Sequence, residues 1–391
     1  MAQIRKEEYL KIRKAARIVT EQVIKPTADI SDRQAKPHKE GIEKLAELGL
    51  LGIYIPPTLG GHPADARSFA AVIEEISRAC PSTALLVATH VAACATLAKF
   101  ADERQQSNWF SQLSSGEWLC GFAGRESDLM LPPNDPADCV AKKEKGEYVI
   151  NGERRFVSGA HFFNAFLVLT RVEEKSGMES DAVFFVQGDD EGFIRAETDD
   201  RLGLRAMASG TLKFRNLRVG EEKMAGRVGD GIRMGREFKS HALLGAAAAA
   251  LGISLEMVHI ASDYVRDMLN RRGPQFGRQR ATRYLANMAV WVQAMRLMVE
   301  DAAYRSDIGE AIGELPLQAY MAKAFNAEMA VKVGDSALKL IGTHGYSRQY
   351  ALERLFRDLR GLMLQYVGTD ALLEAIGETE LDSPFISQYE L

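Results

Sequence analysis

Cysteine is scarce in this chain, and its spacing carries no metal or disulfide pattern. The 391 residues include four cysteines, Cys80, Cys94, Cys120 and Cys139. They form no CxxC pair and no histidine-linked ligand spacing, so neither a zinc site nor a disulfide framework is expected. We therefore predict reduced thiols that mostly fill hydrophobic cores, and no metal site.

Several catalytic motifs are also missing. The sequence has no Walker-type phosphate loop, no GxGxxG after a strand, no GxSxG elbow and no HExxH helix. It has no internal repeat and no low-complexity segment. No motif therefore points to a P-loop nucleotidase, a serine hydrolase or a zinc protease.

Strong net charge and long apolar runs are absent as well. The formal net charge of −4 is spread along the chain, which argues against a nucleic acid as a partner. The longest apolar run, residues 242–253, is too short to span a bilayer. Residues 1–17 are charged throughout and lack the apolar core of a secretion signal. We expect a soluble, cytoplasmic protein with no membrane partner.

What is present is an ordinary globular composition, with 46% hydrophobic and 26% charged residues. The hydrophobic period changes twice along the chain, from helical to β-rich and back. We therefore predict an α+β fold with a helical N-terminal domain at 1–115, a central antiparallel β-domain at 116–228 and a C-terminal helical bundle domain at 229–391.

Individual elements follow from the same patterns. Helices are expected at residues 8–23, 39–48, 69–78 and 83–100. Short β-rich runs predict strands at residues 118–122, 148–150, 166–171, 182–186 and 211–214. The alanine run at 246–250 predicts a later helix that packs closely against another.

The end of the chain contains two glycine turns around a helix. The first turn is GTHG at 342–345, and the helix at 352–363 carries apolar residues at helical spacing. A second turn at 367–369 ends this helix, and Thr369 or Asp370 would cap a last helix at 371–376.

Several segments together resemble the acyl-CoA dehydrogenase family. The C-terminal signature is matched by GTHGY at 342–346, ERLFRD at 353–358 and GT at 368–369. RFVSG at 155–159 resembles, without a gap through residue 171, a strand-turn-strand of the family. The resemblance covers nearly the whole chain. It implies an acyl-CoA dehydrogenase-like fold with a C-terminal four-helix bundle, FAD as the cofactor, and a homotetramer or homodimer.

The resemblance implies flavin contacts at the turn after residue 155. Phe156 would flank the isoalloxazine ring, Val157 lies in the same turn, and the Ser158 hydroxyl would bond the flavin near N5 and O4. A flavin requires donors along its polar edges and an apolar surface against its ring, so these residue types suit the role.

A neighbouring segment, GFAGRESD at 121–128, stands where the family binds its ligands. The resemblance places Gly121, Phe122 and Ser127 at this site. Ser127 would lie near the pantetheine or pyrophosphate of a CoA-type ligand.

Further contacts are implied between subunits. RRGPQFG at 271–277 resembles an RxxFG segment, so Arg271 or Arg272, with Phe276, would reach the FAD pyrophosphate across a dimer interface. A guanidinium can bind two phosphate oxygens at once.

The glycine turns belong to the same implied site. Gly342, Thr343 and Gly345 would lie against the FAD of a neighbouring subunit, and Thr369 belongs to the Gly-Thr pair of the signature.

The catalytic base of the family is missing at both of its positions. The residue before the Gly-Thr pair is Val367, and the alternative position falls near Ala242. The base is therefore unknown, and the candidates are Asp370, Tyr366, His90 and His241.

His90 has two interpretations. It is a histidine packed inside an apolar helix, or it faces a flavin pocket, as in flavin monooxygenases of the same superfamily.

Three functional hypotheses follow. The first is α,β-dehydrogenation of an acyl thioester of CoA or a carrier protein, with a non-standard or absent base and an unknown electron acceptor. The second is a flavin-dependent monooxygenase, supported by His90 and Ser158. The third is a catalytically silent paralogue.

Overall fold

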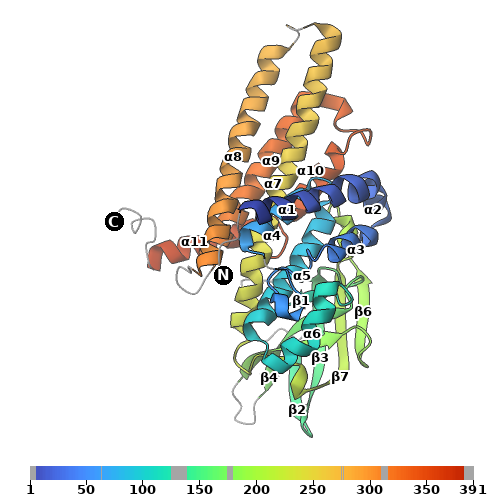
Figure 1. Cartoon of the computed structure of the whole chain (residues 1–391), viewed down its shortest axis with the longest axis vertical. Helices are drawn as coiled ribbons and strands as arrows, with labels where there is room; N and C mark the ends of the chain where they lie inside the picture. Colours follow the sequence, from blue (N-terminus) through green and yellow to red (C-terminus); the bar gives the residue numbers. More distant parts are fainter. Residues whose placement is uncertain are drawn as a thin grey trace.

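The computed structural model describes residues 6–62, 64–124, 139–173, 179–273, 275, 277–309 and 316–382. Helices form the N-terminal part, a β-sheet follows, and helices form the C-terminal part, so the predicted α+β fold is confirmed. In Figure 1 the sheet lies at the bottom and the long helices α7 and α8 extend to the top. Two predicted site residues, Ser127 and Phe276, lie outside the described residues.

The described N-terminal part contains six α-helices, of which α5 is buried over most of its length. They are α1 (Lys6–Val19), α2 (Ala28–Gln34), α3 (Lys39–Glu47), α4 (Ala66–Ser77), α5 (Pro81–Phe100) and α6 (Glu103–Ser115). All residues of α5 from Pro81 to Leu97 are buried. Local sequence defines the ends of α6, because Asp102 and Gln105 form a capping box and Gly116 closes the helix at a φ of 76°.

The central sheet has eight strands among the described residues. They are β1 (Cys120–Ala123), β2 (Val140–Glu144), β3 (Glu147–Val157), β4 (Ala165–Glu173), β5 (Glu179–Gln187), β6 (Phe193–Thr198), β7 (Gly210–Gly220) and β8 (Met224–Ala225). Their order is β6-β7-β3-β2-β4-β5-β8, and β1 pairs with β4. The sheet is mixed and not purely antiparallel as expected, because β1 and β2 each run parallel to β4.

The C-terminal part consists of three long helices and two shorter ones among the described residues. They are α7 (Gly231–Arg272), α8 (Arg278–Ile308), α9 (Leu317–Ile341), α10 (Leu352–Leu362) and α11 (Thr369–Asp382). α7 packs against α4, α5 and α9 through its alanine-rich middle. A Cβ added to Gly245 would lie 2.8 Å from the Ala88 Cβ, and one added to Gly252 would lie 2.2 Å from the Glu74 carbonyl oxygen. The predicted close packing of the alanine run is therefore confirmed.

Two buried carboxylates join the N-terminal helices to α8. Glu74 and Glu75 on α4 are 4% and 1% exposed. Arg13 of α1 pairs with both at 2.6 and 2.7 Å, Arg17 pairs with Glu75 at 2.8 Å, and Arg296 of α8 pairs with Glu74 at 3.0 Å. Buried carboxylates require such partners, so this cluster fixes how α1, α4 and α8 pack.

Two helices are long and apolar enough to cross a membrane by length and composition alone. They are α5 and α7, and 83% and 78% of their most apolar windows are buried inside the protein. The buried core helices of soluble proteins also meet this criterion of length and composition.

The four cysteines are buried and form no disulfide, as their spacing predicts.

Candidate active site

The loop between α10 and α11 contains Val367, the position at which the resemblance predicts a catalytic base. Within it, the Val367 N–H donates to the Gln365 carbonyl at 2.8 Å, and Tyr366 between them has a φ of 62°. This is a γ-turn with its central residue at positive φ, a rare and strained conformation. Such a conformation persists only where surrounding contacts enforce it.

One of these contacts reaches the β-domain. The Gln365 Nε2 donates to the Ser158 Oγ at 2.8 Å, across 207 residues of sequence. Both side chains are buried. The two segments that resemble the family most closely, residues 155–159 and 342–369, therefore meet at Gln365 and Ser158.

The turn around Ser158 is shaped by an irregular strand. The pairing of β3 with β7 shifts register between Arg154 and Val157, and Phe156 has a φ of 52°. The shift leaves the Phe156 ring 61% exposed, while Val157 is buried. An exposed aromatic ring beside a buried hydroxyl is the surface that a flat cofactor with polar edges requires, so these residues fit FAD.

Tyr366 is held against α5. Its hydroxyl donates to the Leu85 carbonyl at 3.1 Å and lies 2.8 Å from the Thr89 Oγ1. Burial raises the pKa of Tyr366 well above its ordinary value. The phenol is therefore neutral and its hydroxyl is engaged, which does not suit a base.

Aromatic side chains pack next to Tyr366. Phe122 of β1 stacks on Phe238 of α7 at 4.5 Å between ring centroids, and Phe238 meets the Tyr366 ring edge-on at 6.1 Å. Ala242, one turn after Phe238, belongs to the same apolar cluster. Gly121 is buried in β1, where a Cβ would lie 2.9 Å from the Phe163 ring.

The Gly-Thr pair is also engaged. The Thr369 Oγ1 donates to the Met363 carbonyl at 3.2 Å and is buried. Val367, in the base position, is 9% exposed, whereas Asp370 is an exposed residue in the first turn of α11. The Thr369 hydroxyl thus links the end of the loop to its beginning at Met363. Asp370 is exposed to solvent in the first turn of α11.

His241 forms a pair with a carboxylate on α7. Its Nε2 lies 3.2 Å from the Glu237 Oε1, and Lys99 also contacts Glu237, at 2.5 Å. Burial alone would raise the pKa of Glu237, but the hydrogen bonds and charges of His241 and Lys99 lower it to about 2. The His241 ring lies 4.6 Å from the Tyr54 ring, tilted by 55°, and its buried Nδ1 has no hydrogen-bond partner among the described residues.

His90 has the geometry of a packed histidine. The Cys120 N–H donates to its Nδ1 at 3.0 Å, and its Nε2 lies 3.1 Å from the Leu113 carbonyl. The ring is 1% exposed, and burial lowers its pKa to about 4. Of the two interpretations, this geometry favours the histidine packed inside the helical domain over the one that faces a flavin pocket.

The remaining predicted residues gather at the ends of α7 and α9. Gly342, Thr343 and His344 form an exposed turn in which Gly342 has a φ of 72°. Gly345 is buried, where a Cβ would meet Leu352 and Ile341 at 2.9 and 3.1 Å.

α7 brings its arginines to the same region. Tyr264 of α7 lies 6.1 Å from the His344 ring and 6.2 Å from the Tyr350 ring. Two turns later, Arg271 and Arg272 are exposed, and the Arg271 Nε donates to Asp267 at 2.9 Å.

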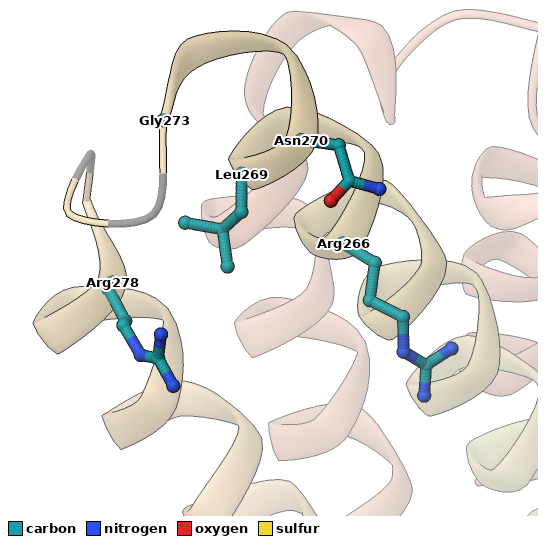
Figure 2. A pocket seen from close by; sticks show the side chains of 5 residues that line it. All are labelled: Arg266, Leu269, Asn270, Gly273 and Arg278. Atoms are coloured by element: carbon teal, nitrogen blue, oxygen red, sulfur yellow. The ribbon is translucent and has the colours of Figure 1, made fainter.

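A hollow opens between the ends of α7 and α8. It has a volume of about 490 Å³ and is lined by Arg266, Leu269, Asn270, Gly273 and Arg278. Figure 2 shows the Arg266 side chain on α7 and the Arg278 side chain on α8, on either side of the hollow. Its arginines were not among the predicted contacts, because RxxFG directs attention to residues 271 and 272.

Comparison with known proteins gives the same assignment for the whole chain. Three family models match: the acyl-CoA dehydrogenase N-terminal domain at residues 6–117, the middle domain at 127–217 and the C-terminal domain at 229–379. The chain therefore belongs to the acyl-CoA dehydrogenase family. The family consists of flavoproteins, which confirms the predicted cofactor, FAD, and the class of FAD-dependent oxidoreductases.

Individual relatives span the full chain. A 3-(aryl)acrylate reductase from Clostridium sporogenes is 30% identical over 371 residues, covering 95% of this chain and 97% of the relative. Butyryl-CoA dehydrogenase from Megasphaera elsdenii is 24% identical, with a TM-score of 0.87 over 97% of this chain and all of that one. A glutaryl-CoA dehydrogenase from Mycobacterium smegmatis, solved in complex with FADH2, is 19% identical, with a TM-score of 0.86 over 96% of this chain and 95% of that one.

Proposed function

We propose that this chain acts on the Cα–Cβ bond of an acyl thioester, of CoA or a carrier protein, with a base other than the residue before the Gly-Thr pair. The observation that carries the proposal is the contact between Gln365 and Ser158. It joins the predicted flavin turn to the loop of the base position, and that position holds the apolar Val367.

The chemistry defines what the protein must supply. A bound flavin would supply the acceptor for a hydride from Cβ, and a protein group would have to take the proton from Cα. A positioned base contributes roughly two to four orders of magnitude in rate. The reverse reaction, reduction of a double bond, needs the same group as an acid.

We propose His241 as this group. It is the candidate with a carboxylate partner, since Glu237 lies 3.2 Å from its Nε2 and would hold the orientation of the ring. Its Nδ1 has no partner among the described residues. Phe238 and Ala242, one turn apart on α7, belong to the apolar cluster against which Tyr366 packs.

A second copy of the chain would complete the cofactor site. We propose that the hollow between α7 and α8, with Arg271 or Arg272 beside it, receives the FAD diphosphate of a partner subunit. The exposed turn at Gly342, Thr343 and His344 would lie against the same cofactor. The grouping of these residues near Tyr264 and their exposure support this assignment.

Anaerobic mixing of the oxidised holoprotein with acyl-CoAs tests the reaction. Butyryl-CoA and a 3-arylpropionyl-CoA are suitable probes, because relatives act on short-chain and aryl compounds by name. We expect the flavin absorbance to bleach with at least one probe. His241→Gln should slow bleaching by roughly two to four orders of magnitude, and Asp370→Asn should leave the rate unchanged.

Each other outcome contradicts part of the proposal. Bleaching of His241→Gln at the wild-type rate would exclude His241 as the base. A holoprotein that no thioester bleaches, in spite of bound FAD, would favour a catalytically silent paralogue. Oxygen consumption coupled to hydroxylation of a substrate would favour a monooxygenase, which the engaged His90 does not support.

A further inference from the structure

A fully buried lysine lies beneath the loop between α10 and α11. Lys323, on α9, has 0% of its surface exposed. Its Nζ donates to the Met363 and Val367 carbonyls, both at 2.7 Å, and lies 3.4 Å from the Thr369 Oγ1. An ammonium group has three donors and no acceptor, so three oxygens satisfy it completely.

The two carbonyl acceptors lie on either side of Gln365. Met363 is two residues before Gln365, and Val367 is two residues after it. Lys323 therefore fixes both ends of the segment that contains the strained γ-turn. A turn with its central residue at positive φ is disfavoured in isolation, so its ends must be held by other parts of the protein.

The side chains of the turn are directed to two other parts of the molecule. Gln365 donates to Ser158 in the β-domain, and Tyr366 contacts Thr89 on α5. α9, the β-domain and α5 therefore each hold the loop by a hydrogen bond. Lys323 differs from the other two because its amine donates to two backbone carbonyls of the loop at once.

We propose that Lys323 is a positioning residue, which holds the loop so that Gln365 fixes the orientation of the Ser158 hydroxyl toward the cofactor. The Ser158 Oγ accepts a hydrogen bond from the Gln365 Nε2, so the proton of the Ser158 hydroxyl is left to donate to another group. The second half of this inference rests on the proposed function, since it requires the flavin edge to lie at Ser158. The first half concerns the loop alone.

The electrostatics agree with this geometry. Burial lowers the pKa of Lys323 to about 7. The three oxygen acceptors oppose this effect, because hydrogen bonds to the charged form stabilise it. A buried cation without such acceptors would be strongly destabilising, so the loop and the lysine depend on each other.

Amide hydrogen exchange of the apoprotein tests the clamp without any cofactor. Lys323→Met retains the length and apolar stem but removes the donors. We expect exchange in residues 363–369 to become at least tenfold faster. The control is Lys332→Met, since Lys332 is exposed on the same helix. Unchanged exchange in Lys323→Met would overturn the inference, whatever the protein binds.

The flavin reduction potential tests the link to Ser158. Loss of one oriented donor should lower the affinity for reduced flavin, relative to that for oxidised flavin, about tenfold. This change corresponds to a reduction potential about 30 mV lower for a two-electron couple. Lys323→Met, Gln365→Leu and the double variant should all show the same shift, because both residues act through Ser158. The link between Lys323 and Ser158 would be contradicted if the shifts in reduction potential of the single variants added up in the double variant. It would also be contradicted if Lys323→Met had the wild-type reduction potential.

A third variant covers the case in which Lys323→Met does not fold. Lys323→Gln retains an amide with two donors, and it should give an intermediate potential and intermediate exchange. Wild-type values for both would overturn the inference. A wild-type protein that binds no FAD would instead contradict the proposed function and leave the exchange result to decide the clamp.

Discussion

Three polar side chains of the candidate site use their polar atoms in hydrogen bonds within the protein. The Tyr366 hydroxyl bonds α5, the Thr369 hydroxyl bonds the Met363 carbonyl, and both nitrogens of His90 lie near backbone groups. A group used to move a proton needs a lone pair that no other group in the protein occupies. Among the four candidate bases, His241 retains a ring nitrogen without a partner in the described part of the chain.

The Glu237–His241 pair gives a pH dependence of stability. The pKa of Glu237 is lowered from 4.5 to about 2 in the folded protein, so its ionised form stabilises the fold. This contribution is present above about pH 4.5 and is lost as the pH falls through about 2. The shift corresponds to about 3 kcal/mol.

Glu237→Gln should therefore lower the free energy of unfolding at pH 7 by at most about 3 kcal/mol, and the difference should shrink as the pH falls from 4.5 toward 2. Chemical denaturation at a series of pH values measures it. Glu43→Gln, at a carboxylate 58% exposed, is the control and should show little effect at any pH. A difference for Glu237→Gln that did not depend on pH would contradict the assigned charge pair.

At the level of elements, strong hydrophobic patterns predicted the structure and weak ones did not. The expected strands at 148–150, 166–171, 182–186 and 211–214 lie inside β3, β4, β5 and β7. β2 and β6 were missed because their side chains are mostly partly or fully exposed, so their sequences lack apolar alternation. α7 was predicted only around its alanines, because the rest of its 42 residues is largely polar.

The candidate site could be predicted only in part for a similar reason. Ser158 and the loop before Thr369 were found because they match sequence signatures. Lys323 carries no such signature, since its two closest acceptors are backbone carbonyls, which any residue provides, and they lie 40 and 44 residues away. Its presence in the middle of a largely buried helix was the available signal.

Close packing of α7 against α4 gives a prediction with an internal control. In Gly252→Ala the new methyl group would lie 2.2 Å from the Glu74 carbonyl oxygen, so backbone must move. We expect a loss of roughly 1–3 kcal/mol in the free energy of unfolding. Gly235→Ala on the same helix meets nothing within 4 Å and should be neutral or stabilising. Equal effects of the two substitutions, measured by thermal denaturation, would show that this contact is not tight.

At the level of the whole molecule, α8 exposes an apolar stripe. Val290, Leu297 and Tyr304 are 67%, 57% and 53% exposed, and their spacing of seven residues places them on one face of the helix. A stripe of this kind suits packing against another helix. A second copy of the chain is the expected occupant, because the cofactor site proposed here requires one.

Leu297→Glu should therefore weaken self-association by placing a charge in the stripe. Light scattering coupled to gel filtration would report a mass of two or four chains for the wild type and a smaller mass for the variant. The matched control is Glu300→Gln on the same helix, which is exposed and should retain the wild-type mass. An unchanged mass for Leu297→Glu would place the interface elsewhere.

The proposed activity depends on a flavin bound at the turn that contains Ser158, which Gln365 contacts. The most direct test is the amount of FAD bound per chain after reconstitution, measured by absorbance for the wild type and for Ser158→Val. We predict about one FAD per wild-type chain and a dissociation constant roughly tenfold higher for Ser158→Val, as expected for loss of one hydrogen bond. A colourless wild-type protein, or a Ser158→Val variant that binds FAD with unchanged affinity and an unchanged spectrum, would contradict it.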